Sequence, residues 1–187
     1  MNVYLLGVPA SDMNRGSDYS VFIVVGLADD KRYYLLDMVR DRLNLSERGN
    51  TIERLHRRWK PRLVGYEKYG KDSDIEYFQE RMARANYRFM VFPLGGNTRK
   101  DDRIRRLIPR FEQHEVQFPA KLEFRDREGR VRDLVTEFLD DEFLGFPVGR
   151  HDDMLDCLAR IVDPDFPASW PLSAEPEEPE DEDPRPR

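Results

Sequence analysis

Three sets of acidic residues, far apart in this chain of 187 residues, stand where they could form one site. Asp12 and Asp18 follow an apolar segment near the N-terminus, Glu67 ends a second apolar segment, and Asp152-Asp153 opens a late helical segment. Carboxylates that are far apart in sequence can meet at one edge of a sheet. There they can hold two divalent cations about 3.5–4 Å apart for attack on a phosphodiester. The layout therefore indicates two-metal phosphodiester chemistry.

Each of these acids also has a structural interpretation. Glu67 could be a solvated acid at a strand end, paired with Lys68. Asp152 and Asp153 stand where acids are favoured by helix capping and by the helix dipole, although two adjacent carboxylates cannot both cap, which leaves one to face a site. His151, just before them, is a phosphate-facing residue or a plain loop histidine.

Asp12 and Asp18 lie in a turn-rich connection, where aspartate commonly bonds to its own backbone. Turn chemistry is the simpler interpretation of both residues. As the alternative, either carboxylate could serve as a further metal ligand.

The first part of the chain predicts the sheet that would position these acids. Segments 2–8, 19–28 and 32–40 have strand composition at hairpin spacing, which predicts an antiparallel meander. Helices are then predicted over 46–59 and 74–86, and strands over 63–67 and 88–93, placed in parallel beside the first strand. The fold class is therefore α/β, with a five-stranded mixed sheet.

The second part of the chain is predicted to be mainly helical. We expect helices over 101–111, 134–143 and 152–162, and a hairpin of short strands near 115–118 and 121–125. Proline and acidic residues dominate the end of the chain. We therefore expect one domain over 1–165 and an acidic, proline-rich tail over 166–187, disordered from about residue 173.

Composition restricts the possible functions. Cys157 is the only cysteine, so no internal disulfide can form, and no apolar run approaches a membrane span, so a cytoplasmic protein without membrane contact is expected. The net charge is -6, but residues 173–187 hold seven acidic and two basic residues and so account for most of it. The nearly neutral remainder has basic surface to spare for phosphate. No GxxxxGK[ST] phosphate loop is present.

Basic residues cluster on and before the predicted helix at 101–111. Such a cluster can contact the DNA backbone through phosphates, although a run of charges can also be simply a solvated face. A second cluster, in and after helix 46–59, has the same two interpretations; it contains Arg54, Arg57, Arg58, Lys60 and Arg62. The candidate DNA-binding residues are Arg99, Lys100, Arg103, Arg105 and Arg106, with Lys68 and Lys71 after the strand at 63–67.

Several separated stretches agree in order and spacing with one known family. They are Tyr4-Leu5-Leu6 with Pro9-Ala10-Ser11, Gly16-Ser17-Asp18-Tyr19-Ser20, Val64-Gly65-Tyr66-Glu67-Lys68-Tyr69-Gly70, Gly95-Gly96, Asp102-Arg103-Ile104, Phe146-Pro147 and His151-Asp152-Asp153-Met154-Leu155-Asp156. Together, over residues 2–165, they resemble the C-terminal nuclease domain of phage terminase large subunits. The resemblance implies an RNase H-like fold, with a five-stranded mixed sheet flanked by helices. It also implies a metal-dependent endonuclease that cuts concatemeric viral DNA during genome packaging.

The resemblance also implies roles for individual residues. Glu67 matches the second acid of the family and Asp152 and Asp153 match the third, so these three are the candidate catalytic residues and ligands of Mg²⁺ or Mn²⁺. The first acid falls on Val8, and an aliphatic side chain cannot bind a hard cation. Cleavage is therefore expected to be impaired unless Asp12 or Asp18 takes over that position.

The family context implies partners and leaves alternatives open. The expected partners in the host cytoplasm are double-stranded DNA and, encoded separately, a packaging ATPase, a small terminase subunit and a portal. The chain starts at this domain without the ATPase motor, as expected of an isolated domain, a split gene product or a prophage remnant. The alternative function is a catalytically inactive DNA-binding or packaging-complex module. A third class, a Holliday-junction resolvase of the same fold, agrees with fewer of the motifs.

Overall fold

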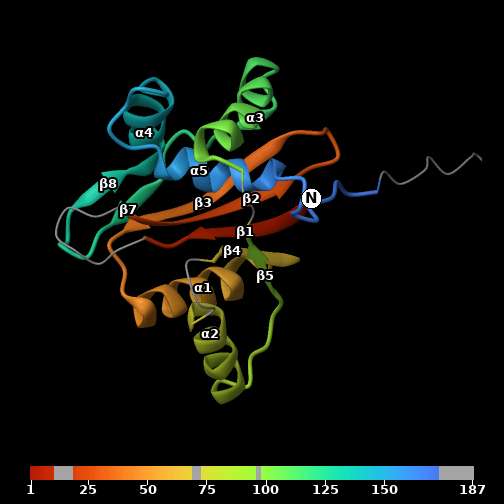
Figure 1. The fold of residues 1–187 in the computed structure, drawn as a ribbon, viewed down its shortest axis with the longest axis vertical. Helices are drawn as coiled ribbons and strands as arrows, with labels where there is room; N and C mark the ends of the chain where they lie inside the picture. Colours follow the sequence, from red (N-terminus) through yellow and green to blue (C-terminus); the bar gives the residue numbers. More distant parts are fainter. Residues whose placement is uncertain (11–18, 69–72, 96–97, 173–187) are drawn as a thin grey trace, which may run out of the picture.

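A six-stranded mixed sheet with helices on both faces forms the centre of the molecule (Figure 1). The structure is a computed structural model, and it describes residues 1–10, 19–68, 73–95 and 98–172. The strand order is β5-β4-β1-β2-β3-β6. The strands are β1 (Asn2–Val8), β2 (Ser20–Leu27), β3 (Tyr33–Asp41), β4 (Leu63–Glu67), β5 (Val91–Leu94) and β6 (Val116–Gln117).

The predicted pairing of the first five strands is confirmed. β1, β2 and β3 form an antiparallel meander. β4 pairs in parallel with β1, and β5 pairs in parallel with β4. The helical connections explain this change of direction, because parallel neighbours need a crossover whereas antiparallel neighbours need only a turn.

The sheet has six strands, so the prediction of five strands was wrong by one. β6 pairs in parallel with the start of β3, where Tyr33 is opposite Val116. The predicted hairpin was also wrong, because β7 (Glu123–Arg125) pairs instead with β8 (Val131–Asp133). The turn between β7 and β8 determines this pairing: Asp126 accepts backbone hydrogen bonds from Glu128 and Arg130, and Gly129 adopts a φ of 84°.

Two helices cover one face of the sheet, and the remaining helices cover the other (Figure 1). The first pair is α1 (Leu45–Trp59) and α2 (Ser73–Arg84). The opposite layer contains α3 (Lys100–Glu112), α4 (Leu134–Glu137), a π-helix (Phe138–Phe143), α5 (Asp153–Ala159) and a 3-10 turn (Arg160–Val162). The helix expected over 134–143 is therefore present, but its second half has the wider π-helical winding.

Both faces of the sheet are buried, which explains the long apolar runs in β1 and β2. Along β1, Tyr4, Leu6 and Val8 belong to the core beneath α3 and α5, whereas Leu5 belongs to the core beneath α1 and α2. The packed body extends to Trp170, whose ring lies 4.9 Å from that of Tyr33. Within the described residues, no helix has the length and apolar character needed to cross a membrane.

Candidate active site

The carboxyl ends of β1 and β4 bring Val8 and Glu67 side by side. Gly7 is opposite Tyr66 in the parallel pairing, so the next residue of each strand lies at the same edge of the sheet. A Cβ added to Gly7 would lie 2.9 Å from the rings of both Phe22 and Tyr66, in the core on the α1 side. Because side chains alternate along a strand, Val8 and Glu67 point to the opposite side, towards α3 and α5.

Val8 is a core residue at this edge. Its exposure is 6%, and it belongs to the same cluster as Met154 and Cys157 of α5. The sulfur of Cys157 lies 3.7 Å from the carbonyl oxygens of both Leu6 and Val21, so α5 packs directly on β1 and β2. The position that the family resemblance assigns to the first acid is therefore filled by an aliphatic side chain packed beneath α5.

Glu67 is bound by cations of the protein itself. Nη2 of Arg160 donates to its Oε1, and Nη2 of Arg103 lies 3.9 Å from the same oxygen. Glu67 is only 8% exposed, and burial raises the pKa of its carboxyl group against the opposing effect of Arg160. Its Oε2 is buried and has no hydrogen-bond partner among the described residues.

Arg103 joins Glu67 to α5. Its guanidinium group is bidentate on Asp156, with Nε 2.6 Å from Oδ1 and Nη2 3.0 Å from Oδ2. Arg103 and Asp156 are 4% and 2% exposed, respectively, so this pair is fully internal. Arg160 in turn donates to Asp163 over 3.0 Å. The result is a buried network of alternating charges that connects β4, α3 and α5.

Lys100, the first residue of α3, forms ion pairs with both Asp152 and Asp153. Its Nζ lies 2.6 Å from Oδ1 of Asp152 and 3.3 Å from Oδ1 of Asp153. Burial alone would lower the pKa of Lys100, but the hydrogen bond to Asp152 and the charge of Asp153 raise it above its usual value. The ammonium group therefore stays charged and neutralises part of the acidic pair.

The N-terminus of α5 is capped by Glu142, which sequence reasoning did not identify. Oε2 of this buried residue accepts from the backbone nitrogens of Met154, at 2.7 Å, and Leu155, at 3.1 Å. Nη2 of Arg40 lies 3.5 Å from the other carboxylate oxygen. Burial raises the pKa of Glu142 to about 7. Asp152 occupies the N-cap position without a capping hydrogen bond of its own, so the capping interpretation of the aspartate pair does not describe this helix.

The predicted DNA-binding residues differ in how far they are exposed. Arg99, Arg105 and Arg106 are exposed on α3 or just before it, and Lys68 is exposed after β4. Arg103 is buried against Asp156 and is therefore not available to a phosphate at the surface. Lys100 is half-buried between Asp152 and Asp153.

Three predicted site residues lie outside the described residues. They are Lys71, a candidate DNA-binding residue, and Asp12 and Asp18, the candidate further metal ligands.

The described residues do not fit a pair of divalent ions. Five acids and four cations share the edge, so the site is close to neutral, whereas two dications need a clear excess of carboxylate. In the part of the chain that the structure describes, no three His, Cys, Asp or Glu residues form a group that could hold a metal ion. The acids are Glu67, Asp152, Asp153, Asp156 and Asp163, and the cations are Lys100, Arg103, Arg106 and Arg160.

Comparison with known proteins indicates the fold. No family model and no curated protein matches the sequence. The human cytomegalovirus terminase nuclease domain has a similar structure, with a TM-score of 0.55 at 14% identity, covering 87% of this chain and 83% of that domain. At this identity the similarity concerns the fold alone: this chain folds like that terminase nuclease domain.

Two Holliday junction resolvases match less well. The yeast mitochondrial enzyme Ydc2 has a TM-score of 0.48 at 10% identity, covering 83% of this chain and 75% of its own. RuvC of T. thermophilus, in complex with a Holliday junction substrate, has a TM-score of 0.41 at 12% identity. The similarity covers 85% of this chain and 89% of the RuvC chain.

Proposed function

We propose that this chain is a terminase-type nuclease-fold module that binds double-stranded viral DNA in the genome-packaging complex and has lost most or all of its cleavage activity. The observation that carries this proposal is the pair formed by Val8 and Glu67 at the edge of the sheet. An apolar side chain occupies the first acid position, and Arg160 and Arg103 already neutralise the second acid. A site of this kind can retain the shape of a nuclease without holding two dications.

The DNA surface is assigned to the exposed cations near this edge. Arg99, Arg105 and Arg106 lie on or beside α3, and Lys68 follows β4. Contacts from such residues to phosphate oxygens provide affinity and orientation without sequence preference. The proposed partners are a packaging ATPase, a small terminase subunit and a portal, all encoded separately, in the host cytoplasm.

The proposal is tested by measuring binding and cleavage on the same preparation. Fluorescence anisotropy with a labelled duplex should show binding that weakens steeply with salt, because counterions are released. Incubating supercoiled plasmid with Mg²⁺ or Mn²⁺ should give little or no nicking. The substitution pair Arg105→Gln/Arg106→Gln should weaken binding, since both side chains are exposed. If this double substitution leaves the affinity for the duplex unchanged, Arg105 and Arg106 are not part of the DNA-binding surface.

One observation favours a second candidate, a divalent-metal-dependent endonuclease. Glu67 Oε2 and Asp153 Oδ2 are both buried without a hydrogen-bond partner among the described residues. Unpaired buried carboxylate oxygens are costly, and a cation is one way to satisfy them. Asp12 or Asp18 would then have to supply the ligand that Val8 lacks. Strong Mg²⁺-dependent nicking by the unmodified chain, abolished by Asp12→Ala or Asp18→Ala, would select this candidate over the first.

A further inference from the structure

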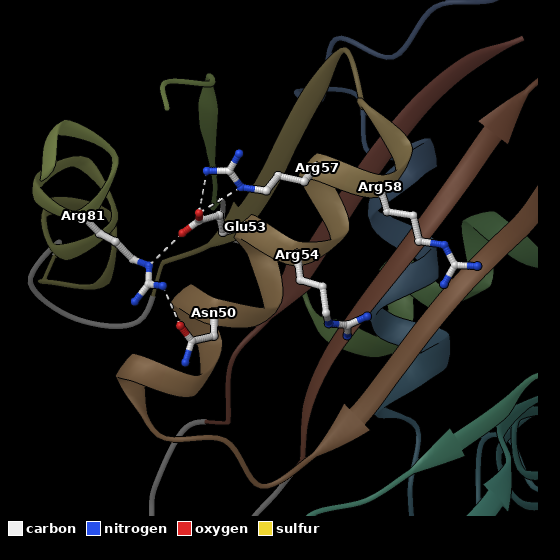
Figure 2. Close-up of a pocket in the computed structure, with 6 residues that line it drawn as sticks. All are labelled: Asn50, Glu53, Arg54, Arg57, Arg58 and Arg81. Carbon is white, nitrogen blue, oxygen red and sulfur yellow. Dashed lines mark hydrogen bonds and ion pairs between the residues drawn. The ribbon is translucent and has the colours of Figure 1, made fainter. Parts of the chain in front are cut away.

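Residues of α1 and α2 line a shallow groove. These two helices cover the face of the sheet opposite to α3 and α5 (Figure 1). The volume of the groove is about 560 Å³. We call it the arginine groove, and Figure 2 shows the residues that line it: Asn50, Glu53, Arg54, Arg57, Arg58 and Arg81. Four arginines and one glutamate give this surface a clear excess of positive charge.

Glu53 fixes two of the arginines across the gap between the helices. Its Oε1 accepts from Nε and Nη2 of Arg57 over 3.0 and 2.8 Å, and its Oε2 accepts from Nε of Arg81 over 3.1 Å. Arg81 also donates through Nη2 to Oδ1 of Asn50. These bonds hold both guanidinium groups in place before any ligand arrives, so binding loses less side-chain entropy.

The other two arginines are directed to solvent. Arg54 is exposed and makes no hydrogen bond or ion pair with any described residue. The Arg58 side chain is 63% exposed, and its Nη1 lies 3.3 Å from Asp37. Figure 2 shows both side chains extending from α1 away from Glu53. Residues 54, 57 and 58 share one side of α1 because three or four positions separate neighbours on a helix surface.

The chemistry of the arginine groove suits phosphate. A guanidinium group is planar, is always charged and presents a fork of donors that matches phosphate oxygens. The groove is shallow and open, which fits a polymer passing over it better than an enclosed small molecule. The positive surface continues beyond it, because Arg57 stacks 3.9 Å from the ring of Tyr87 and Lys60 lies 3.3 Å from the hydroxyl of that tyrosine.

From these observations we propose that the arginine groove binds the phosphate backbone of a DNA duplex. The groove would be a second DNA contact. It lies on the α1–α2 face of the sheet, whereas the side chains of Val8 and Glu67 point to the other face, towards α3 and α5. This inference goes beyond the proposed function and does not depend on the α3 surface. A module with contacts on two faces can hold two duplex segments at once.

The test compares two double substitutions that each remove two exposed positive charges from this side of the molecule. Arg54→Gln/Arg58→Gln changes the groove, and Arg84→Gln/Arg88→Gln, outside the groove lining, is the matched control. Anisotropy of a labelled duplex is measured between about 50 and 200 mM salt. The groove pair should weaken binding about tenfold at the lower salt and reduce the slope of log affinity against log salt by about 2, whereas the control should stay within about twofold of wild type.

Each outcome decides the proposal. The proposal is overturned if the groove pair and the control pair lower the affinity for the duplex equally, or if the groove pair does not lower it. It is also overturned if the chain binds a synthetic peptide of residues 173–187 at the groove but no duplex, because the groove would then be a dock for acidic peptide. If Arg105→Gln/Arg106→Gln leaves binding unchanged while the groove pair weakens it, the result supports the groove as a DNA contact and contradicts the α3 surface assigned under the proposed function. Thermal melts of all variants exclude unfolding as the cause.

Discussion

Arg160, in the turn after α5, donates to Glu67 at the end of β4, so the second acid of the expected metal site is already bound to an internal cation. The Arg160 side chain is 2% exposed and also holds Asp163. A buried charge that loses its partner is costly, because the remaining ion has been removed from water without compensation. The pair therefore holds the end of α5 on the sheet at Glu67, the residue that the family resemblance matches to the second acid.

Removing Arg160 should destabilise the protein strongly. We expect Arg160→Met to lower the free energy of unfolding by about 3–5 kcal/mol, because Glu67 would keep a buried negative charge with only Arg103 nearby. Adding Glu67→Gln to this variant should recover part of the loss. Urea denaturation followed by circular dichroism measures both effects, and Arg105→Met, at an exposed site, serves as the control. A loss below about 1 kcal/mol would mean that the pair is not fully desolvated.

Glu142 should make stability depend on pH. Burial raises its folded-state pKa from 4.5 to about 7, so the folded protein binds a proton here more tightly than the unfolded chain does. Its contribution therefore favours the folded state below about pH 4.5 and is lost as the pH rises towards 7, with a slope of at most about 1.4 kcal/mol per pH unit. Glu142→Gln should remove this part of the pH dependence.

The measurement for Glu142 is the difference in unfolding free energy between variant and wild type, from urea titrations at several pH values from 5 to 8. Groups that do not interact with residue 142 titrate equally in both proteins, so they cancel in the difference. A difference that is constant across this range would show that Glu142 remains ionised in its buried site, held by Arg40 and the α5 amides.

Sequence reasoning located the edge of the sheet correctly. The apolar runs and hairpin spacing predicted the meander, and the helix-linked strands predicted the parallel pair that ends at Glu67. The missed strand, β6, has only two residues and is defined by its partner β3 rather than by its own pattern. A segment this short has no periodicity for a sequence to reveal.

The partners of the acids could not be predicted from the sequence. Arg103 lies in the amphipathic helix α3, and Arg160 lies in the 3-10 turn that ends the segment predicted as helix 152–162; arginine usually faces solvent at such positions. Only the packing of α3 and α5 on the sheet turns them inward towards Glu67 and Asp156. Glu142 was likewise included in a predicted regular helix, and the π-helical winding that contains it has no clear sequence signature.

The end of the chain should weaken DNA binding through its charge. Residues 173–187 contain seven acidic and two basic residues, so deleting them removes five net negative charges. Repulsion between like charges is long-ranged at low salt, and we expect a severalfold gain in duplex affinity that fades as salt rises. Anisotropy of full-length and truncated chains tests this expectation. Identical affinities at low salt would show that these residues have no electrostatic role in binding.

Val8→Asp should raise cleavage activity above the little or none that we expect of the unmodified chain. The new carboxylate would stand beside Glu67, where it would compete for Arg160 and supply the missing ligand between two cations. Nicking should be stronger with Mn²⁺ than with Mg²⁺, because Mg²⁺ demands near-ideal octahedral geometry and dehydrates reluctantly. The control is Val8→Asn, which has nearly the same shape without the charge and should stay inactive. Plasmid nicking with each metal is the assay. If Val8→Asp folds, as judged by circular dichroism, and still fails to nick, the ion pairs of Arg160 and Lys100 are sufficient to exclude metal from this edge.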